Sequence, residues 1–231
     1  MKILAYDTSN KFLSVAVLDE EELLSNFHKD IGIKHSSMLM PTIDKTLKRA
    51  HLELKNIDAI ALNIGPGSFT GLRIGVAVAK ALSLATNIPV IGVPSLDVIA
   101  HNYTNQEGYI SIVLDARKSK VYSAIYESAS GEISRISEYL LVDVDSLIEK
   151  LKGPTLFFGD GLSLYGEYMA KHCPLVKFSK DTNWYPRAEI IGKLGLEKIK
   201  KGYREDIDKL VPMYLHPKEC NISSKRVSSK W

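Results

Sequence analysis

The order of hydrophobic and polar positions along the chain predicts a series of short strands and helices. Alternation at every second position is typical of half-buried strands, whereas apolar residues that recur every three or four positions are typical of helices. The stretch 35–51, for example, places Leu39, Ile43 and Leu47 on one stripe. For the first half of the chain these patterns predict strands at 3–6, 12–18 and 23–28, a helix at 35–51, a strand at 57–64, a helix at 71–86, a strand at 89–93 and a short helix at 95–101.

The second half repeats this order. Each half begins with three strands, the first of which ends at an aspartate (Asp7 or Asp115), and continues with a helix, a strand, a glycine-containing turn and another helix. The predicted elements are strands at 109–114, 121–126 and 133–141, a helix from the cap Asp143 to 151, a strand at 155–158, a helix ending at 172, a strand at 175–178 and a helix at 188–201. We therefore predict a duplicated α/β fold with mixed sheets flanked by helices, with lobes at 1–103 and 104–216 and a basic tail at 217–231.

Composition and charge narrow the class of protein only a little. The 231 residues are 45% hydrophobic and 25% charged, and their net charge of +3 is too small to indicate a nucleic-acid binder. Cys173 and Cys220 are far apart and outside any paired pattern, which favours a reducing, cytoplasmic location. Arg73 and Lys80 interrupt the longest apolar stretch, so we expect no membrane contact.

The segment NIGPGSFTGLRIG at 63–75 reads as a strand that ends in a glycine-rich turn and opens a helix. Backbone amides at a helix start can hold a phosphate, so nucleotide-binding loops have to be considered. A Walker loop requires Lys and then Ser or Thr after its last glycine, but Gly71 is followed by Leu72 and Arg73. A dinucleotide fingerprint requires GxGxxG, and Gly71 comes one residue too late. The pattern excludes both loops.

Small residues follow one line along the helix that this segment opens. Gly71, Gly75 and Ala79 recur at four-residue intervals, so a second backbone can approach closely along that line. Two interpretations are open. Either the helix is buried within its own lobe, or one side of it packs against a helix of a partner protein.

Several segments together resemble the TsaB (YeaZ) family of tRNA threonylcarbamoyladenosine biosynthesis subunits. The most specific is GPGSFTGLRIG; the others are the opening LAYDTS, the helix start KHS, LDAR followed by VY, and the closing VPMYL. The resemblance covers residues 1–216. It departs at His216, where the family commonly has arginine, and in the tail at 218–231, which we interpret as disordered, with contact to tRNA as the alternative.

The resemblance implies an actin-like (ASKHA, ribonuclease H-like) fold and a non-catalytic role. The chain would pair with a TsaD-type catalytic subunit and, together with a TsaE-type small ATPase, serve the transfer of threonylcarbamoyl to the adenosine beside the anticodon of tRNA. Without that partner it would form a homodimer through the same surface. The resemblance also implies a contact through the first two helices, made by His35, Ser36, Leu39, Ile43, Arg73, Gly75, Val76, Ala79 and Lys80.

The resemblance also bears on catalysis and cofactors. TsaD-type proteins carry a metal-binding His-x-x-x-His after the strand that corresponds to 89–93, whereas this chain has Ser95 and Ile99 there. Neither residue replaces an imidazole ligand, so we expect no metal and no catalysis by this chain alone. The residues that would face a nucleotide in the actin-like superfamily are Asp7, Thr8, Ser9, Asp115, Gly159, Asp160 and Gly161. We interpret them as structural turns with no cofactor required, and keep ATP or ADP in the cleft or at the partner interface as the alternative.

Other classes of function remain open. A stand-alone actin-like kinase or ATPase would need Asp7 and Asp115 for turnover. A metal-dependent peptidase is disfavoured because the His-x-x-x-His pair is missing. A free-standing RNA-binding module is disfavoured because the sequence has no basic stripe interleaved with aromatic residues.

Overall fold

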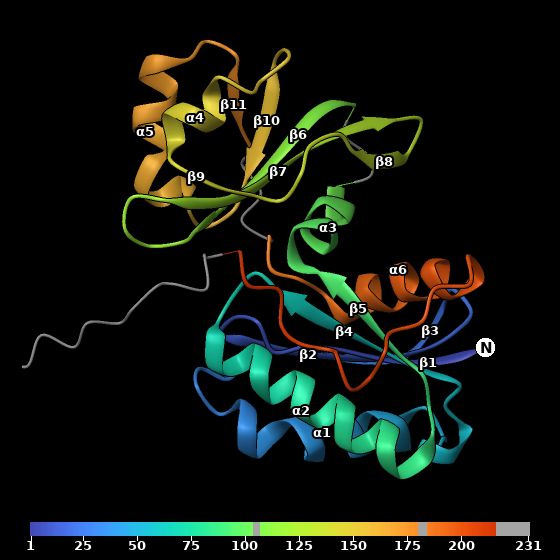
Figure 1. The fold of residues 1–231 in the computed structure, drawn as a ribbon. Coiled ribbons are helices and arrows are strands. Elements are labelled where there is room, and N and C mark those ends of the chain that lie inside the picture. The colour runs from blue at the N-terminus through green and yellow to red at the C-terminus, as the bar shows by residue number, and fades with distance from the viewer. Residues whose placement is uncertain (104–106, 180–183, 216–231) are drawn as a thin grey trace, which may run out of the picture.

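The computed structural model describes residues 1–103, 107–179 and 184–215, which form two mixed β-sheets, one above the other in Figure 1. Helices flank both sheets, so the predicted α/β class with two mixed sheets is confirmed. The predicted tail at 217–231, which includes Cys220, lies outside the described residues, and so does His216 before it.

The first sheet has the strand order β3-β2-β1-β4-β5. Its first three strands are antiparallel neighbours, whereas β1, β4 and β5 run parallel and need helical crossovers between them. The helices α1 and α2 supply these crossovers. The elements are β1 (Lys2–Asp7), β2 (Phe12–Asp19), β3 (Glu22–Asp30), α1 (His35–Arg49), a 3₁₀ turn (Leu54–Asn56), β4 (Ala59–Gly65), α2 (Phe69–Thr86) and β5 (Val90–Pro94).

The second sheet repeats this plan in the order β11-β10-β6-β7-β8, with β9 paired to β7. Here β6 and β7 are antiparallel, and β10 runs parallel to both β6 and β11. The predicted duplication is therefore present in the structure. The elements are β6 (Gly108–Asp115), β7 (Val121–Ala129), β8 (Glu132–Arg135), β9 (Leu140–Val142), α4 (Val144–Ile148), β10 (Thr155–Phe158), α5 (Leu162–His172) and β11 (Val176–Phe178).

The single strand predicted at 133–141 is wrong, because the chain breaks there into β8 and β9. β8 pairs with the last residues of β7 and β9 with its first residues. Between them the chain bulges around Ile125, whose carbonyl accepts from Ile136 N and whose N–H donates to Ser137 Oγ, both at 2.9 Å. These bonds to the middle of β7 replace a continuous ladder, and a hydrophobic pattern alone does not reveal them.

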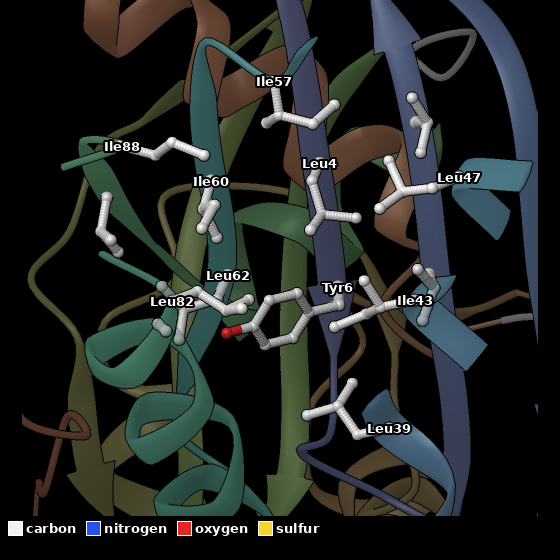
Figure 2. Packing of buried hydrophobic residues seen from close by; sticks show 14 of the residues in the cluster. Leu4, Tyr6, Leu39, Ile43, Leu47, Ile57, Ile60, Leu62, Leu82 and Ile88 are labelled. Carbon is white, nitrogen blue, oxygen red and sulfur yellow. The ribbon is translucent and has the colours of Figure 1, made fainter. Parts of the chain in front are cut away.

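One face of the first sheet packs against α1 and α2. Figure 2 shows Leu4, Tyr6 and Leu62 of the strands facing Leu39 and Ile43 of α1 in one buried cluster. Burying a side chain of this size contributes about 2 kcal/mol relative to exposure, so this cluster is a main source of stability in the lobe.

The opposite face of the first sheet packs against α6 (Ala188–Lys200), which comes from the far end of the chain (Figure 1). A Cβ at Gly192 would lie 2.4 Å from Leu18 Cδ1, so the helix sits very close to the strands. The lobe boundary at 103/104 stays a prediction. However, α6 lies within the range predicted for the second lobe, although it packs on the first sheet.

The short helix α3 (Ser95–Ala100) joins the two sheets and continues into a 3₁₀ turn (His101–Tyr103). Its apolar residues Leu96 and Ile99 pack with β6 and β7, while Val98 packs with α6 and the first sheet. The carboxylate of Asp97 accepts from Tyr126 OH at 2.8 Å and from Tyr139 OH at 2.6 Å. α3 is therefore the packed connection between the sheets.

Among the described residues, one helix, α2, is long and apolar enough to cross a membrane by length and composition alone. One third of that stretch (33%) is buried, and its buried side packs on the first sheet as the core helix of a globular domain does. The expectation of no membrane contact stays a prediction.

Candidate functional site

The glycine-rich segment brings the start of α2 against the end of β1. Thr8 Oγ1 donates to the Gly71 carbonyl at 2.7 Å, and Tyr6 OH donates to the Gly75 carbonyl at 2.9 Å. A Cβ at Gly71 would lie 1.9 Å from the Thr8 carbonyl oxygen, and one at Gly75 would lie 2.6 Å from Thr8 Oγ1. The line of small residues therefore faces β1 of the same chain and not a partner protein.

Most of the residues predicted for a partner contact are thus buried inside this chain, and the structure corrects that prediction. The apolar periodicity of a helix marks the side that must leave water, but it does not say whose surface covers that side. Here the first sheet covers it, so a bulky residue at Gly75 would disturb folding rather than report on pairing. The buried members are His35, Leu39, Ile43, Gly75, Val76 and Ala79.

The other predicted contact residues lie at the surface. Ser36 and Arg73 are exposed, and Lys80 is half-buried with its Nζ donating to the Asp208 carbonyl at 3.0 Å. His35, at the start of α1, points inward, and its Nε2 lies 3.2 Å from the Phe12 carbonyl oxygen. This histidine therefore holds α1 to β2.

The outward side of α2 is apolar and made mostly of small residues. Leu84 near its end is 72% exposed and Phe69 at its start is 55% exposed. Arg73 lies over the Phe69 ring, 3.8 Å from the ring centroid, and its Nε donates to Tyr214 OH at 3.0 Å. We refer to the following exposed residues as the α2 outer face: Phe69, Arg73, Ala77, Ala81, Leu84 and Ala85.

The turn after β1 holds a buried carboxylate. Asp7 Oδ1 accepts from Ser9 N at 2.9 Å and from Asn63 Nδ2 at 2.8 Å, and Oδ2 accepts from Asn10 Nδ2 at 2.7 Å. Asn63 Oδ1 in turn accepts from Ser95 Oγ at 2.8 Å. Burial raises the pKa of Asp7 to about 6, although the hydrogen bonds from Ser9 and Asn63 oppose the rise. The carboxylate thus ties the end of β1 to β4, and Asn63 ties β4 to the start of α3.

We expect this raised pKa to make folding pH-dependent. An acid whose pKa is about 6 when folded and 3.8 in its ordinary state binds its proton more tightly in the folded chain. Its contribution to stability is therefore full below pH 3.8 and is lost as the pH rises through 6. Relative to Asp7→Asn, the parent should gain about 2 kcal/mol in the free energy of unfolding between pH 7.5 and 4.5.

Urea unfolding of both proteins at several pH values measures this difference. The pKa of His28 is lowered by burial and by Arg187, which works in the opposite direction in this pH range. Because His28 is present in both proteins, its effect cancels in the comparison. Parallel pH profiles for parent and variant would contradict the prediction.

In the second lobe, the turns after β6 and β10 are also held by hydrogen bonds within the chain. Asp160 Oδ1 accepts from Asp115 N, and Asp115 Oδ1 accepts from Arg117 N, both at 2.9 Å. Gly159 has φ +121°, and a Cβ there would lie 2.1 Å from the Val113 carbonyl oxygen, so this position requires glycine. Partial desolvation raises the pKa of Asp160.

Many polar groups of these turns are already engaged by hydrogen bonds within the chain. At the first turn both Asp7 oxygens already accept from chain donors. At the second, the N–H groups of Gly161, Leu162 and Ser163 donate to carbonyl oxygens of the chain at 3.1, 3.3 and 3.1 Å. Amides engaged in this way do not form the open anion site that a helix start can offer. ATP or ADP, in the cleft or at a partner interface, stays a prediction.

Ser95 and Ile99, which stand in place of the metal-binding histidines, have internal roles. Ser95 Oγ donates to Asn63, and Ile99 is 1% exposed in the core between α3 and the second sheet. Both positions are used for packing and for the hydrogen-bond network around Asp7.

Comparison with known proteins decides the family. The sequence model of the family described as "TsaD: tRNA N6-adenosine threonylcarbamoyltransferase" matches residues 22–218. The chain is 31% identical to the tRNA threonylcarbamoyladenosine biosynthesis protein TsaB of Bacillus subtilis, over 95% of this chain and 96% of that protein. The chain belongs to the TsaB family.

Further relatives agree with this placement. TsaB of Escherichia coli is 28% identical over the full length of both chains. The solved structure of YeaZ from Pseudomonas aeruginosa superposes with a TM-score of 0.79 at 28% identity, over 93% of this chain and 99% of that one. The predicted resemblance to this family is confirmed, and so is the predicted α/β class with two mixed sheets.

For this TsaB-family chain, the sequence analysis missed the outer face of α2. Ala77, Ala81 and Leu84 recur at intervals of three or four residues, so the signal was present in the sequence. It was masked because the buried line of Gly71, Gly75 and Ala79 has the same periodicity. Only the packing on β1 shows which line is covered.

Proposed function

We propose that this chain is a non-catalytic subunit of the machinery that forms threonylcarbamoyladenosine in tRNA, and that it pairs with a TsaD-type catalytic subunit. Family membership supports this pathway, because the relatives are named for threonylcarbamoyladenosine biosynthesis and match essentially the whole chain. The observation that supports pairing is the α2 outer face, which is apolar, exposed and built on a rigid helix.

The small residues of this face suit helix-to-helix contact. Ala77 and Ala81 lie one turn apart and leave room for another helix to approach, while Leu84 and Phe69 offer apolar area at the two ends. Arg73, positioned by Phe69 and Tyr214, offers a cation at the edge. Ser36 and Met40 on the exposed side of α1 extend the same contact.

The residues at the positions where catalysis would be expected have structural roles, which supports a non-catalytic function. Asp7 is buried with both oxygens engaged, and Ser95 and Ile99 serve the internal network and the core. A carboxylate whose oxygens already accept three hydrogen bonds is poorly placed to coordinate a metal or activate a hydroxyl. In this proposal the catalytic step belongs to the TsaD-type partner.

The remaining parts of the proposal concern the assembly. A TsaE-type small ATPase joins the complex, tRNA is reached through the complex, and the reaction takes place in the cytoplasm. When the partner is absent, two copies of this chain pair through the α2 outer face, because an exposed apolar helix face favours self-association.

Reconstituted tRNA threonylcarbamoylation tests the proposal directly. Purified TsaD-type subunit, TsaE-type ATPase, tRNA and threonylcarbamoyl-adenylate are combined with and without this chain, and modified adenosine is measured by mass spectrometry. We expect product only when this chain and the TsaD-type subunit are both present. Equal product without this chain would overturn the proposal, as would product formed by this chain without the TsaD-type subunit.

A further inference from the structure

A cavity of about 230 Å³ lies beside α3, where the two sheets meet, and the proposed pairing does not use it. Figure 1 shows α3 between the sheets, with α6 below it and β8 above it. Side chains from all three elements line the cavity, so both sheets contribute to its walls. The α2 outer face belongs to a helix on the other face of the first sheet from α6, so the two surfaces are separate.

The volume and the apolar lining of this cavity limit the size of a ligand. Drug-sized ligands usually occupy about 300–1,000 Å³, so this cavity suits a smaller molecule. Val93 of β5, Ile133 of β8 and Leu194 of α6 form the aliphatic part of the lining. The ligand is therefore compact, and any organic part of it is small.

Lys198 of α6 brings a half-buried ammonium to the cavity. Its Nζ donates to the Gly92 carbonyl at 2.8 Å and lies 5.5 Å from the centroid of the Tyr203 ring. An ammonium has three N–H donors, so this one carbonyl leaves donors for a ligand. Burial lowers the pKa of Lys198, although the attraction of Asp97 and Glu205 opposes the shift. A bound anion would supply a closer counter-charge.

Arg135 of β8 lines the same cavity from the second sheet. Its guanidinium lies over the Tyr139 ring, 4.0 Å from the centroid, and its Nη1 donates to the Ser137 carbonyl. Its Nε lies 3.8 Å from Asp97 Oδ1, which is long for an ion pair. A guanidinium carries five N–H donors in a planar fork that matches oxyanions. Arg135 is therefore held in place and still has donors for a ligand.

The two carboxylates of the lining do not cancel this positive charge. Asp97 Oδ1 accepts from Tyr126 OH and Oδ2 from Tyr139 OH, so both of its oxygens are engaged by the chain. Glu197 is exposed, where water screens its charge. Lys201, exposed just after α6, adds a further cation. The lining therefore favours an anion, and hydroxyl groups of a ligand can donate to Glu197.

We propose that this cavity binds a compact phosphate-type dianion, either inorganic phosphate or a small phosphomonoester. A phosphate presents oxygens in several directions, which suits cations that arrive from two elements, whereas a carboxylate presents two oxygens in one plane. Arg135 and Lys198 donate to the phosphate oxygens, and Lys201 adds positive charge at the rim. The ligand thereby joins the two lobes beside α3.

Isothermal titration calorimetry of the full-length chain tests this proposal. Sodium phosphate and glycerol 3-phosphate are titrated at constant ionic strength, and we expect saturable binding of at least one, with none for sodium chloride. Binding of glycerol 3-phosphate about threefold tighter or more means that the ligand is a phosphomonoester, because its organic part gains contacts. Otherwise the ligand is the inorganic ion. No saturable binding of either compound would overturn the proposal.

Variants place the binding in this cavity. Lys198→Met and Arg135→Gln should each weaken it about tenfold or more, because each removes hydrogen bonds to a charged group. Lys201→Gln, at an exposed position where folding is unaffected, should weaken it about threefold. The matched control is Lys193→Gln, which removes an exposed charge of α6 outside the lining and should leave the affinity unchanged.

The outcomes of these variants are distinct from those of the tRNA reaction. A full effect in only one of Lys198→Met and Arg135→Gln would contradict a ligand that joins the lobes. Equal effects of Lys201→Gln and Lys193→Gln would show attraction to general charge and overturn the site, even if the other two variants fold poorly. None of these changes lies on the α2 outer face, so failure to bind phosphate leaves the proposed pairing intact.

Discussion

Replacing Gly71 by alanine is expected to destabilise the chain by about 3 kcal/mol or more. The new Cβ would lie 1.9 Å from the carbonyl oxygen of Thr8, a distance that no rotamer change relieves because both groups are close to the backbone. The start of α2 would have to move away from β1, which also breaks the bond from Thr8 Oγ1 to the Gly71 carbonyl. Urea denaturation followed by circular dichroism measures the loss.

Gly166→Ala is the matched control for this prediction. It is also a glycine-to-alanine change inside a helix, but the nearest atom to its Cβ, outside the helix's own backbone, is a Phe178 ring carbon at 3.8 Å. There the expected change is neutral or a gain of about 0.4–1 kcal/mol, because alanine restricts the unfolded chain and favours helix. Similar stability in the two variants would show that α2 does not approach β1 as closely as described.

Leu84→Glu is expected to weaken pairing with the TsaD-type subunit strongly while leaving the fold intact. Leu84 is 72% exposed in the isolated chain, so a carboxylate there meets water and costs little stability. In a helix-to-helix contact the same carboxylate would be buried without a partner, which weakens binding about thirtyfold or more. Gel filtration and calorimetry with the purified partner measure the loss, and tRNA threonylcarbamoylation should fall in parallel.

Leu164→Glu supplies the comparison on another helix. Leu164 is an exposed leucine on α5, 62% accessible, and lies in the second lobe. We expect this variant to pair and support modification like the parent, with a melting temperature close to that of Leu84→Glu. Normal pairing by Leu84→Glu, or equal loss in both variants, would remove α2 from the proposed contact.

The positions of the helices and strands follow closely from local pattern. The first three-stranded meander and the helices α1, α2 and α6 were predicted because each carries a clear period of two or of three to four residues. The break between β8 and β9 was missed because it depends on hydrogen bonds that Ile125 makes with Ile136 and Ser137, eleven to twelve residues away: its carbonyl accepts from Ile136 N, and its N–H donates to Ser137 Oγ. Periodicity measures local alternation and carries no information about such pairing.

The candidate sites were predictable only in part, because sequence spacing does not show which residues meet in space. The family resemblance directed attention to α1, α2 and the two aspartate turns, and the comparisons confirm the family. However, Gly71 and Ala77 belong to two lines on one helix with the same spacing, so the sequence could not say which line is exposed. Likewise, the hydrogen bonds around Asp7 depend on residues far along the chain. Asn63 on β4 donates to Asp7 and accepts from Ser95 at the start of α3.

The sequence by itself therefore determined the fold class, the internal duplication and the family, because each depends on local period or on contiguous motifs. The tertiary structure alone decided that α6 returns to cover the first sheet, that the glycine line faces β1, and that basic residues of β8 and α6 line one cavity. These features depend on contacts between residues far apart in the chain. Such contacts are set by the packing of whole elements, which the order of residues within any one element does not specify.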